Sequence, residues 1–190
     1  MTRLARLACS AAALLMAPQL LAADPGQWTL VAADSELTFS AYYEGEELPG
    51  RFTRFAVTLE TNVETGEPAD LLVEVQTASA DMNDREVNAE IVEPGWFDAQ
   101  AFPVASFVSQ DIQPAENGAF LASGRLRIKG IEQALKIPLK WTREGNRAIL
   151  TGSVRLSRLD WQVGTGEWSN DASLSDRVDV RWRATLVPAD

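Results

Sequence analysis

The chain has 190 residues, and its 27 Asp and Glu against 17 Lys and Arg give a net charge of −10 at pH 7. This acidic balance argues against nucleic acid, and against an anionic membrane surface reached by electrostatics, as partners. The absence of His excludes Ser-His-Asp catalysis and the usual zinc, copper and haem sites, which leaves carboxylate chemistry or calcium or magnesium held by oxygens.

The first predicted element is a secretory signal peptide, residues 1–23. Basic residues near the start precede an apolar run, Leu7–Ala17, and the small residues Ala22 and Ala23 follow it. The run is too short to span a bilayer. Cleavage removes the only cysteine, so the mature protein is expected to form no intrachain disulfide. Residues 24–190 are predicted to form one domain that depends on its hydrophobic core.

Most of the mature sequence alternates apolar and polar residues with the period of half-buried strands. In chain order the predicted strands are 28–32, 36–43, 54–59, 71–76, 104–112, 120–129, 135–142, 148–156 and 177–186. Segment 44–50, which is acidic and contains glycines, is predicted to be a turn. Eight or nine antiparallel strands with one apolar face most simply close into a barrel, and a two-sheet sandwich fits the pattern nearly as well.

The alternation is interrupted by a short helix predicted over residues 84–92. Its apolar residues have the spacing of one helix face, and Glu86 and Glu90 fall on the opposite, water-facing side. Asn83 or Asp84 can cap its first amides, and a Pro-Gly pair ends it.

Three aromatic residues, Trp96, Phe97 and Phe102, follow the helix closely. They belong either to an ordinary core or, with the helix, to one end of a cavity enclosed by the strands. Small residues on the apolar strand faces favour a hollow barrel because they leave volume unfilled, unless they complement large neighbours in a packed core. These small residues are Ala41, Ala122, Gly124, Gly152 and Ala184.

A set of short motifs runs through essentially the whole mature chain. They are the Trp, Asp-Ser and Phe of 28–39, Gly50-Arg51-Phe52 with Phe55, Asp84-Arg85, Trp96-Phe97-Asp98, Phe102-Pro103, Ser106-Phe107, the run 124–130, Arg158-Leu159-Asp160-Trp161 and Val163-Gly164. Together they resemble the YceI-like lipid-binding proteins of bacterial periplasms. The resemblance implies an extended antiparallel barrel of lipocalin-like shape with a helix near one end. It also implies a periplasmic location and an interior isoprenoid, of the ubiquinone or polyprenyl phosphate sort.

The predicted function is therefore to bind, and to carry or sequester, a long isoprenoid lipid inside the barrel without catalysis, metal or cofactor. The residues predicted to line the cavity are Phe39, Phe55, Val57, Trp96, Phe97, Phe102, Gly124, Leu126, Ile128, Leu150, Gly152, Val154, Val180 and Trp182.

Two other functions remain open. The first is a protein-interaction module whose exposed aromatics dock a membrane enzyme. The run 164–168 is similar to the branch of the family associated with quinone-using b-type cytochromes, which suggests such a cytochrome as the partner. The second is hydrolysis by carboxylate pairs drawn from Asp81, Asp84, Glu86, Glu90 and Glu93, although acidic residues in a first helical turn are more often dipole partners. A monomer and a dimer are both compatible with the sequence.

Overall fold

The computed structural model describes residues 26–170 and 172–189, so the predicted signal peptide, residues 1–23, lies outside the described residues. The described strands are β1 (Gln27–Leu30), β2 (Glu36–Tyr43), β3 (Glu46–Phe52), β4 (Phe55–Thr61), β5 (Pro68–Gln76), β6 (Ala80–Asp81), β7 (Val104–Pro114), β8 (Phe120–Ile128), β9 (Ile131–Glu144), β10 (Arg147–Ser157) and β11 (Arg177–Pro188). The α-helix α1 (Arg85–Glu90) lies between β6 and β7. Short 3-10 helices occupy several turns: η1 (Ala32–Asp34), η2 (Thr77–Ser79), η3 (Glu116–Gly118), η4 (Arg158–Trp161) and η5 (Gly166–Trp168).

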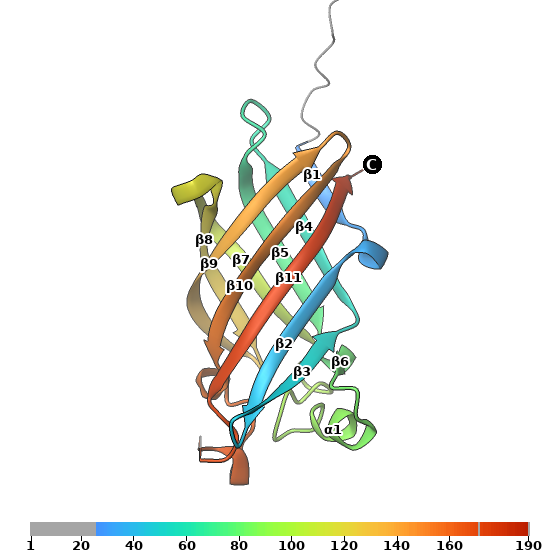
Figure 1. Cartoon of the computed structure of the whole chain (residues 1–190), viewed down its shortest axis with the longest axis vertical. Helices are drawn as coiled ribbons and strands as arrows, with labels where there is room; N and C mark the ends of the chain where they lie inside the picture. Colours follow the sequence, from blue (N-terminus) through green and yellow to red (C-terminus); the bar gives the residue numbers. More distant parts are fainter. Residues whose placement is uncertain (1–25, 171, 190) are drawn as a thin grey trace, which may run out of the picture.

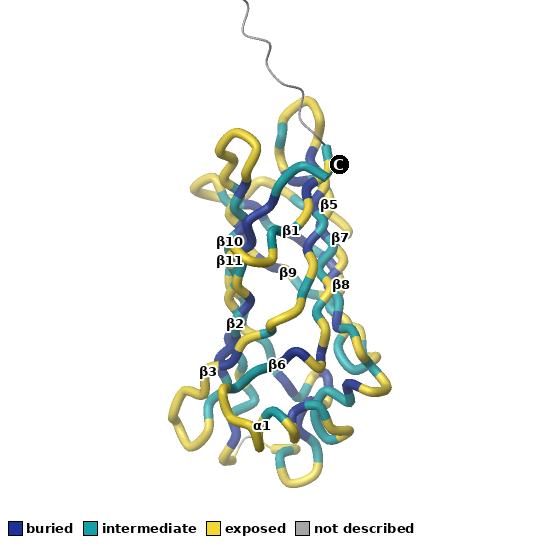
Figure 2. Tube along the Cα trace, turned by 90° about the vertical axis from the view of Figure 1, so that its right-hand side faces the viewer, coloured by how far each residue is buried: buried dark blue, intermediate teal, exposed yellow. Residues whose placement is uncertain are grey.

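Eight strands close into an antiparallel barrel. Their order is β1-β4-β5-β7-β8-β9-β10-β11, and β1 also pairs with β11, which joins the two edges of the sheet. Buried and exposed positions alternate along the strands because one face looks inward and the other outward (Figure 2). The predicted barrel is confirmed, and the sandwich is wrong.

Strand β11 changes its partner along its length. Its end, Leu186–Pro188, pairs with β1, whereas Asp179–Arg183 pairs with β2. Strand β3 pairs with β2, and the two-residue strand β6 pairs with β3. These three strands therefore extend the wall of the barrel toward the end at which α1 lies (Figure 1).

The strand β3 was not predicted. Its residues Glu46–Phe52 were assigned largely to a turn because they include two glutamates, a proline and a glycine, and its first four positions are exposed. The segment is nevertheless a strand because it pairs with β2 from Tyr43↔Glu46 to Thr38↔Arg51. Tertiary pairing overrides a weak local preference here. Strand β9 likewise begins at Ile131, four residues before the predicted start.

The end of the barrel away from α1 is filled by a packed apolar core. Trp28, Leu59, Leu139, Leu150 and Leu186 are at most 1% exposed. The ring of Trp28 meets the edge of the Trp141 ring, with the ring centroids 5.4 Å apart. This close packing seals one end of the barrel interior.

Helix α1 lies across the other end, below β3 and β6 in Figure 1. The Asp84 side chain accepts hydrogen bonds from the amides of Glu86 and Val87, at 2.8 and 3.1 Å, and so caps the helix as predicted. Asn88 ties the helix to β6, because its amide oxygen accepts from the Met82 amide at 2.7 Å and its nitrogen donates to Asp81. Among the described residues, no helix is long and apolar enough to cross a membrane.

Candidate functional site

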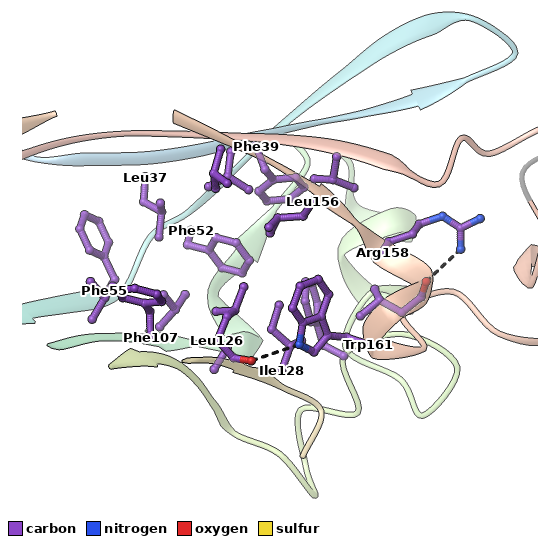
Figure 3. Close-up of a pocket in the computed structure, with 18 of the residues that line it drawn as sticks. Leu37, Phe39, Phe52, Phe55, Phe107, Leu126, Ile128, Leu156, Arg158 and Trp161 are labelled. Carbon is purple, nitrogen blue, oxygen red and sulfur yellow. Dashed lines mark hydrogen bonds between the residues drawn. The ribbon is translucent and has the colours of Figure 1, made fainter. Parts of the chain in front are cut away.

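Between the packed core and α1 the barrel encloses a cavity of about 280 Å³. Of the described residues that line it, only Glu90, Ser106 and Arg158 carry a charged or hydroxyl side chain. In Figure 3, Leu37 and Phe39 lie on one side of this space, Phe107, Leu126 and Ile128 lie on the other, and Phe52 lies between them. An apolar cavity with so few polar groups favours the long hydrocarbon part of a ligand.

Eleven of the fourteen residues that were predicted to line a cavity do line this one. They are Phe39, Phe55, Val57, Trp96, Phe97, Leu126, Ile128, Leu150, Val154, Val180 and Trp182. They come from five strands and from the segment after α1, and the barrel brings them together because each strand turns its apolar side inward.

Gly124 and Gly152 do not line the cavity, so the expectation that they leave empty volume is wrong. A Cβ atom at Gly152 would lie 2.1 Å from the Trp182 ring and 2.5 Å from the Pro138 carbonyl oxygen. One at Gly124 would lie 2.2 Å from the Val108 carbonyl oxygen and 2.7 Å from the Phe107 ring. Each glycine therefore leaves room for an aromatic ring that lies close to the strand backbone.

Phe102 also lies outside the cavity. Its ring sits 2.7 Å from where a Cβ of Gly130 would be, and its carbonyl accepts a hydrogen bond from the Thr77 hydroxyl at 2.8 Å. Of the small residues, Ala41 and Ala184 do line the cavity, whereas Ala122 is fully buried in the packed core.

Sequence reasoning missed the residues that form the cavity floor, which are Trp161, Val163 and Leu174 from the irregular segment between β10 and β11. It also missed Leu48, another lining residue, which comes from the unpredicted β3. The Trp161 indole donates to the Leu126 carbonyl at 3.3 Å, which holds this segment against β8. The motif 158–164, which carries the family resemblance, was the signal that could have located this floor.

Arg158 organises the cavity floor and is 5% exposed. Its five N–H groups donate to the carbonyl oxygens of Val163, Gly164, Asn170, Leu174 and Ser175 at 2.8 to 3.0 Å. Figure 3 draws one of these hydrogen bonds from the Arg158 guanidinium. The guanidinium therefore supports the loop, and its donors are taken up by the main chain.

The cavity meets the surface between α1 and β3. Val87 and Leu48 both line it, yet they remain 41% and 39% exposed, and Glu90 beside them is exposed as well. We call this opening, defined by Leu48, Val87 and Glu90, the mouth. Glu90 was predicted to face away from the cavity, but its carboxylate accepts a hydrogen bond from the Trp96 indole at 3.0 Å. That bond draws Glu90 to the cavity edge.

Three of the five carboxylates considered for hydrolysis, Asp81, Asp84 and Glu90, accept hydrogen bonds that hold the local structure. Asp84 caps α1, as described above. Asp81 accepts hydrogen bonds from the Asn88 side chain, the Asn83 amide and Arg51, and these bonds lower the pKa of its carboxyl group. No group of three or more His, Cys, Asp and Glu gathers in a metal-binding arrangement within residues 26–170 and 172–189.

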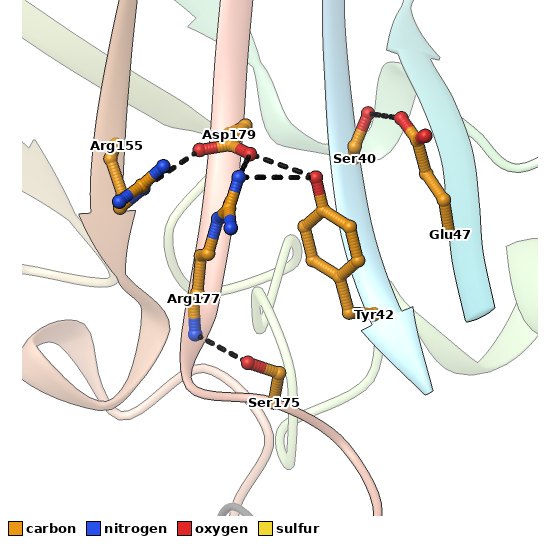
Figure 4. A network of polar contacts seen from close by, with 7 residues as sticks. All are labelled: Ser40, Tyr42, Glu47, Arg155, Ser175, Arg177 and Asp179. Atoms are coloured by element: carbon orange, nitrogen blue, oxygen red, sulfur yellow. Dashed lines mark hydrogen bonds and ion pairs between the residues drawn. The ribbon is translucent and has the colours of Figure 1, made fainter. Parts of the chain in front are cut away.

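A polar network on the outer surface joins β10, β11 and β2 (Figure 4). Asp179 pairs with Arg177, accepts from Arg155 at 3.1 Å and accepts from the Tyr42 hydroxyl at 2.8 Å. The bond from Arg177 is the main reason that the pKa of Asp179 lies far below its ordinary value, and the bond to Asp179 raises the pKa of Tyr42. Because the adjacent Val178 and Val180 line the cavity, this network lies on the outside of the wall.

Comparisons with known proteins agree with this architecture. The crystal structure of BcnA from Burkholderia cenocepacia is 25% identical, covers 82% of this chain and 98% of its own, and superposes with a TM-score of 0.77. A polyisoprenoid binding domain from Saccharophagus degradans, implicated in plant cell wall breakdown, shares the fold at 14% identity, with a TM-score of 0.72 over 85% of this chain and 98% of its own.

Sequence comparison gives the same result. The UPF0312 protein of Shewanella sp. strain ANA-3 is 25% identical over 156 residues, which are 78% of this chain and 82% of that protein. The family model of the YceI-like domain matches residues 28–186, almost all of the described chain. The protein therefore belongs to the YceI-like family.

Proposed function

We propose that the protein binds a long isoprenoid lipid inside its barrel and carries or sequesters it in the periplasm, without chemistry. The observation that carries this proposal is the enclosed apolar cavity, which has a packed core at one end and a mouth at the other. The Saccharophagus degradans relative, whose fold it shares, is described as a polyisoprenoid binding domain. The proposed periplasmic location depends on the predicted signal peptide.

Energetics supports carriage over permanent retention. Each CH₂ group removed from water contributes about 0.8 kcal/mol of favourable transfer free energy, so a chain of several isoprene units binds in the cavity much more favourably than it dissolves in water. The lipid exchanges with a bilayer, however, which is equally apolar. Transfer between membrane and barrel is then close to neutral, and a carrier needs this balance in order to release its cargo.

Extraction of the purified protein tests the proposal. The mature protein, expressed with its own signal peptide in a bacterial periplasm, is extracted with organic solvent, and the extract is analysed by mass spectrometry. We expect an isoprenoid in near-stoichiometric amount. As a control, the variant Leu126→Glu places a charge in the cavity and is expected to lose the lipid. An extract of the folded wild-type protein without isoprenoid would overturn the proposal.

A second function, docking to a membrane protein, is supported by exposed apolar residues near the mouth. Tyr43, Leu48 and Val87 are 37%, 39% and 41% exposed, and the Tyr43 ring lies 6.2 Å from that of Trp168. A quinone-using membrane cytochrome is the partner that we propose for this surface. Co-purification from membranes with the wild type, but not with Leu48→Asp, is the expected result. Equal recovery with both would refute it.

A further inference from the structure

The cavity approaches the surface at a second place, in the wall of the barrel. Because β11 exchanges β1 for β2, the start of β4 has β5 as a partner on one side only, and a groove runs between β4 and β2. Leu37, Phe52 and Phe55 line both this groove and the cavity. We call it the side groove. The polar end of a bound amphiphile therefore has two places to meet water, the mouth and the side groove.

Carboxylates surround the mouth. Glu90 lines it, Glu86 lies on the same helix, and Glu46 shares the strand face of Leu48. Arg85 is the one cation on α1. The first amides of α1, which otherwise attract anions, already donate to Asp84. The mouth is thus an acidic surface.

The side groove offers no excess positive charge either. Arg51 and Arg54 line it, but Glu36 and Glu74 do too. Arg51 is bound through two nitrogens by Asp81, at 3.0 and 3.1 Å. The charges that border the groove therefore nearly cancel.

The cation in the cavity floor does not change this balance. All five N–H groups of Arg158 donate to main-chain carbonyls, so a ligand anion would have to displace bonds that hold the loop. Phosphate groups are held in proteins by free Arg and Lys donors or by exposed main-chain amides. Neither the mouth, the side groove nor the floor provides such a set.

We infer that the cargo has an uncharged polar end, as in a prenyl alcohol or an isoprenoid quinone, and that prenyl phosphates are rejected. This inference rests on the proposed function and narrows it to one class of isoprenoid. The rejection comes from like charges at the mouth, which oppose a dianionic head while leaving a hydroxyl or carbonyl head unaffected.

Three ligands that share the same hydrocarbon chain and differ in the polar end test the inference. Geranylgeraniol, geranylgeranyl phosphate and a naphthoquinone bearing the same geranylgeranyl chain are each placed in phosphatidylcholine vesicles and equilibrated with delipidated protein. The lipid in the vesicle-free protein is then measured by mass spectrometry. We expect the alcohol and the quinone to be retained at least about tenfold more than the phosphate, a difference of about 1.4 kcal/mol. Raising the salt concentration should narrow the gap, because it screens the repulsion.

Two outcomes separate this inference from the proposed function. Equal retention of all three ligands, or preference for the phosphate, would overturn the inference and leave isoprenoid carriage in place. Retention of none would overturn the proposed function, and the inference with it.

Variants that each remove one negative charge show which opening rejects the phosphate. Glu90→Gln removes one negative charge at the mouth and keeps the oxygen that accepts from the Trp96 indole. Glu36→Gln removes one negative charge at the side groove. Glu116→Gln, in the β7–β8 turn, changes the net charge equally but lines neither opening. We expect Glu90→Gln to raise retention of the phosphate severalfold, Glu36→Gln to raise it less because the charges of the side groove nearly cancel, and Glu116→Gln to leave it unchanged. An equal rise in all three variants would refute local rejection.

Discussion

Gly152 is packed so closely by Trp182 that it offers a direct test of side-chain packing in the barrel wall. In Gly152→Ala the new methyl group would start 2.1 Å from the Trp182 ring and 2.5 Å from the Pro138 carbonyl oxygen. Contacts under about 3 Å force the ring or the neighbouring strand to move, and overpacking of this kind costs about 1–3 kcal/mol. For a domain of this size each kcal/mol lowers the melting temperature by about 2–4 °C.

Thermal unfolding followed by circular dichroism measures this loss. Gly95→Ala is the matched control, because the nearest side-chain atom to a Cβ at Gly95 is 3.7 Å away and its φ is not positive. We expect Gly95→Ala to melt within about 1 °C of the wild type, as surface substitutions usually do.

A double-mutant cycle identifies the cause. Trp182→Phe removes the part of the ring that meets the new methyl group, so Gly152→Ala should cost less in that background than in the wild type. Because Trp182 also lines the cavity, its displacement in Gly152→Ala should reduce lipid occupancy. Wild-type melting of Gly152→Ala, or the same loss in both backgrounds, would refute the conclusion that the glycine exists to accommodate the ring.

Three further predictions concern the mouth and the outer wall. Asp84→Ala should lower the free energy of unfolding by about 1 kcal/mol because it removes the cap of α1, and Asp84→Asn should lose only part of this in denaturant titrations. Trp96→Ala and Phe97→Ala should cost less in the lipid-free protein than the roughly 3–5 kcal/mol of a core aromatic, and more in the lipid-loaded protein; equal melting losses in both forms would show that the rings are only scaffold. Asp179 has a lowered pKa in the folded state, so its stabilisation is present above about pH 4 and is lost as the pH falls toward the folded pKa. Asp179→Asn should therefore flatten the acid side of the stability profile, and an unchanged dependence below about pH 4 would contradict that assignment.

The regular alternation of apolar and polar residues predicted most of the strands of the barrel. The predicted strand 36–43 has the observed bounds of β2, and the predicted strand 120–129 extends one residue beyond the end of β8, because apolar residues alternate with polar ones along both segments. The helix prediction was also confirmed, with Asp84 as its cap. Local signals suffice where the physical cause is local.

The prediction failed where long-range contacts decide the structure. Strand β3 shows no apolar alternation in its first four residues, and it forms because β2 offers an edge. The cavity floor from Arg158 to Leu174 has no period at all, because a buried guanidinium and its carbonyl partners fix it. A glycine on an apolar strand face, such as Gly124, cannot reveal from sequence whether it leaves space or holds a ring.

The two ends of the barrel differ in what it would take to open them. Around the packed core, opening would break continuous strand pairing and expose fully buried side chains such as Trp28 and Leu150. At the mouth, α1 is held to its surroundings largely by the bonds of Asn88 and Glu90 and by the buried Ile91. Each such hydrogen bond contributes about 1 kcal/mol net, so displacing α1 costs a small part of what unfolding the barrel costs. Under the proposed function, the lipid would exchange through the mouth while the barrel stays folded, and the acidic groups there would act on each lipid head as it passes.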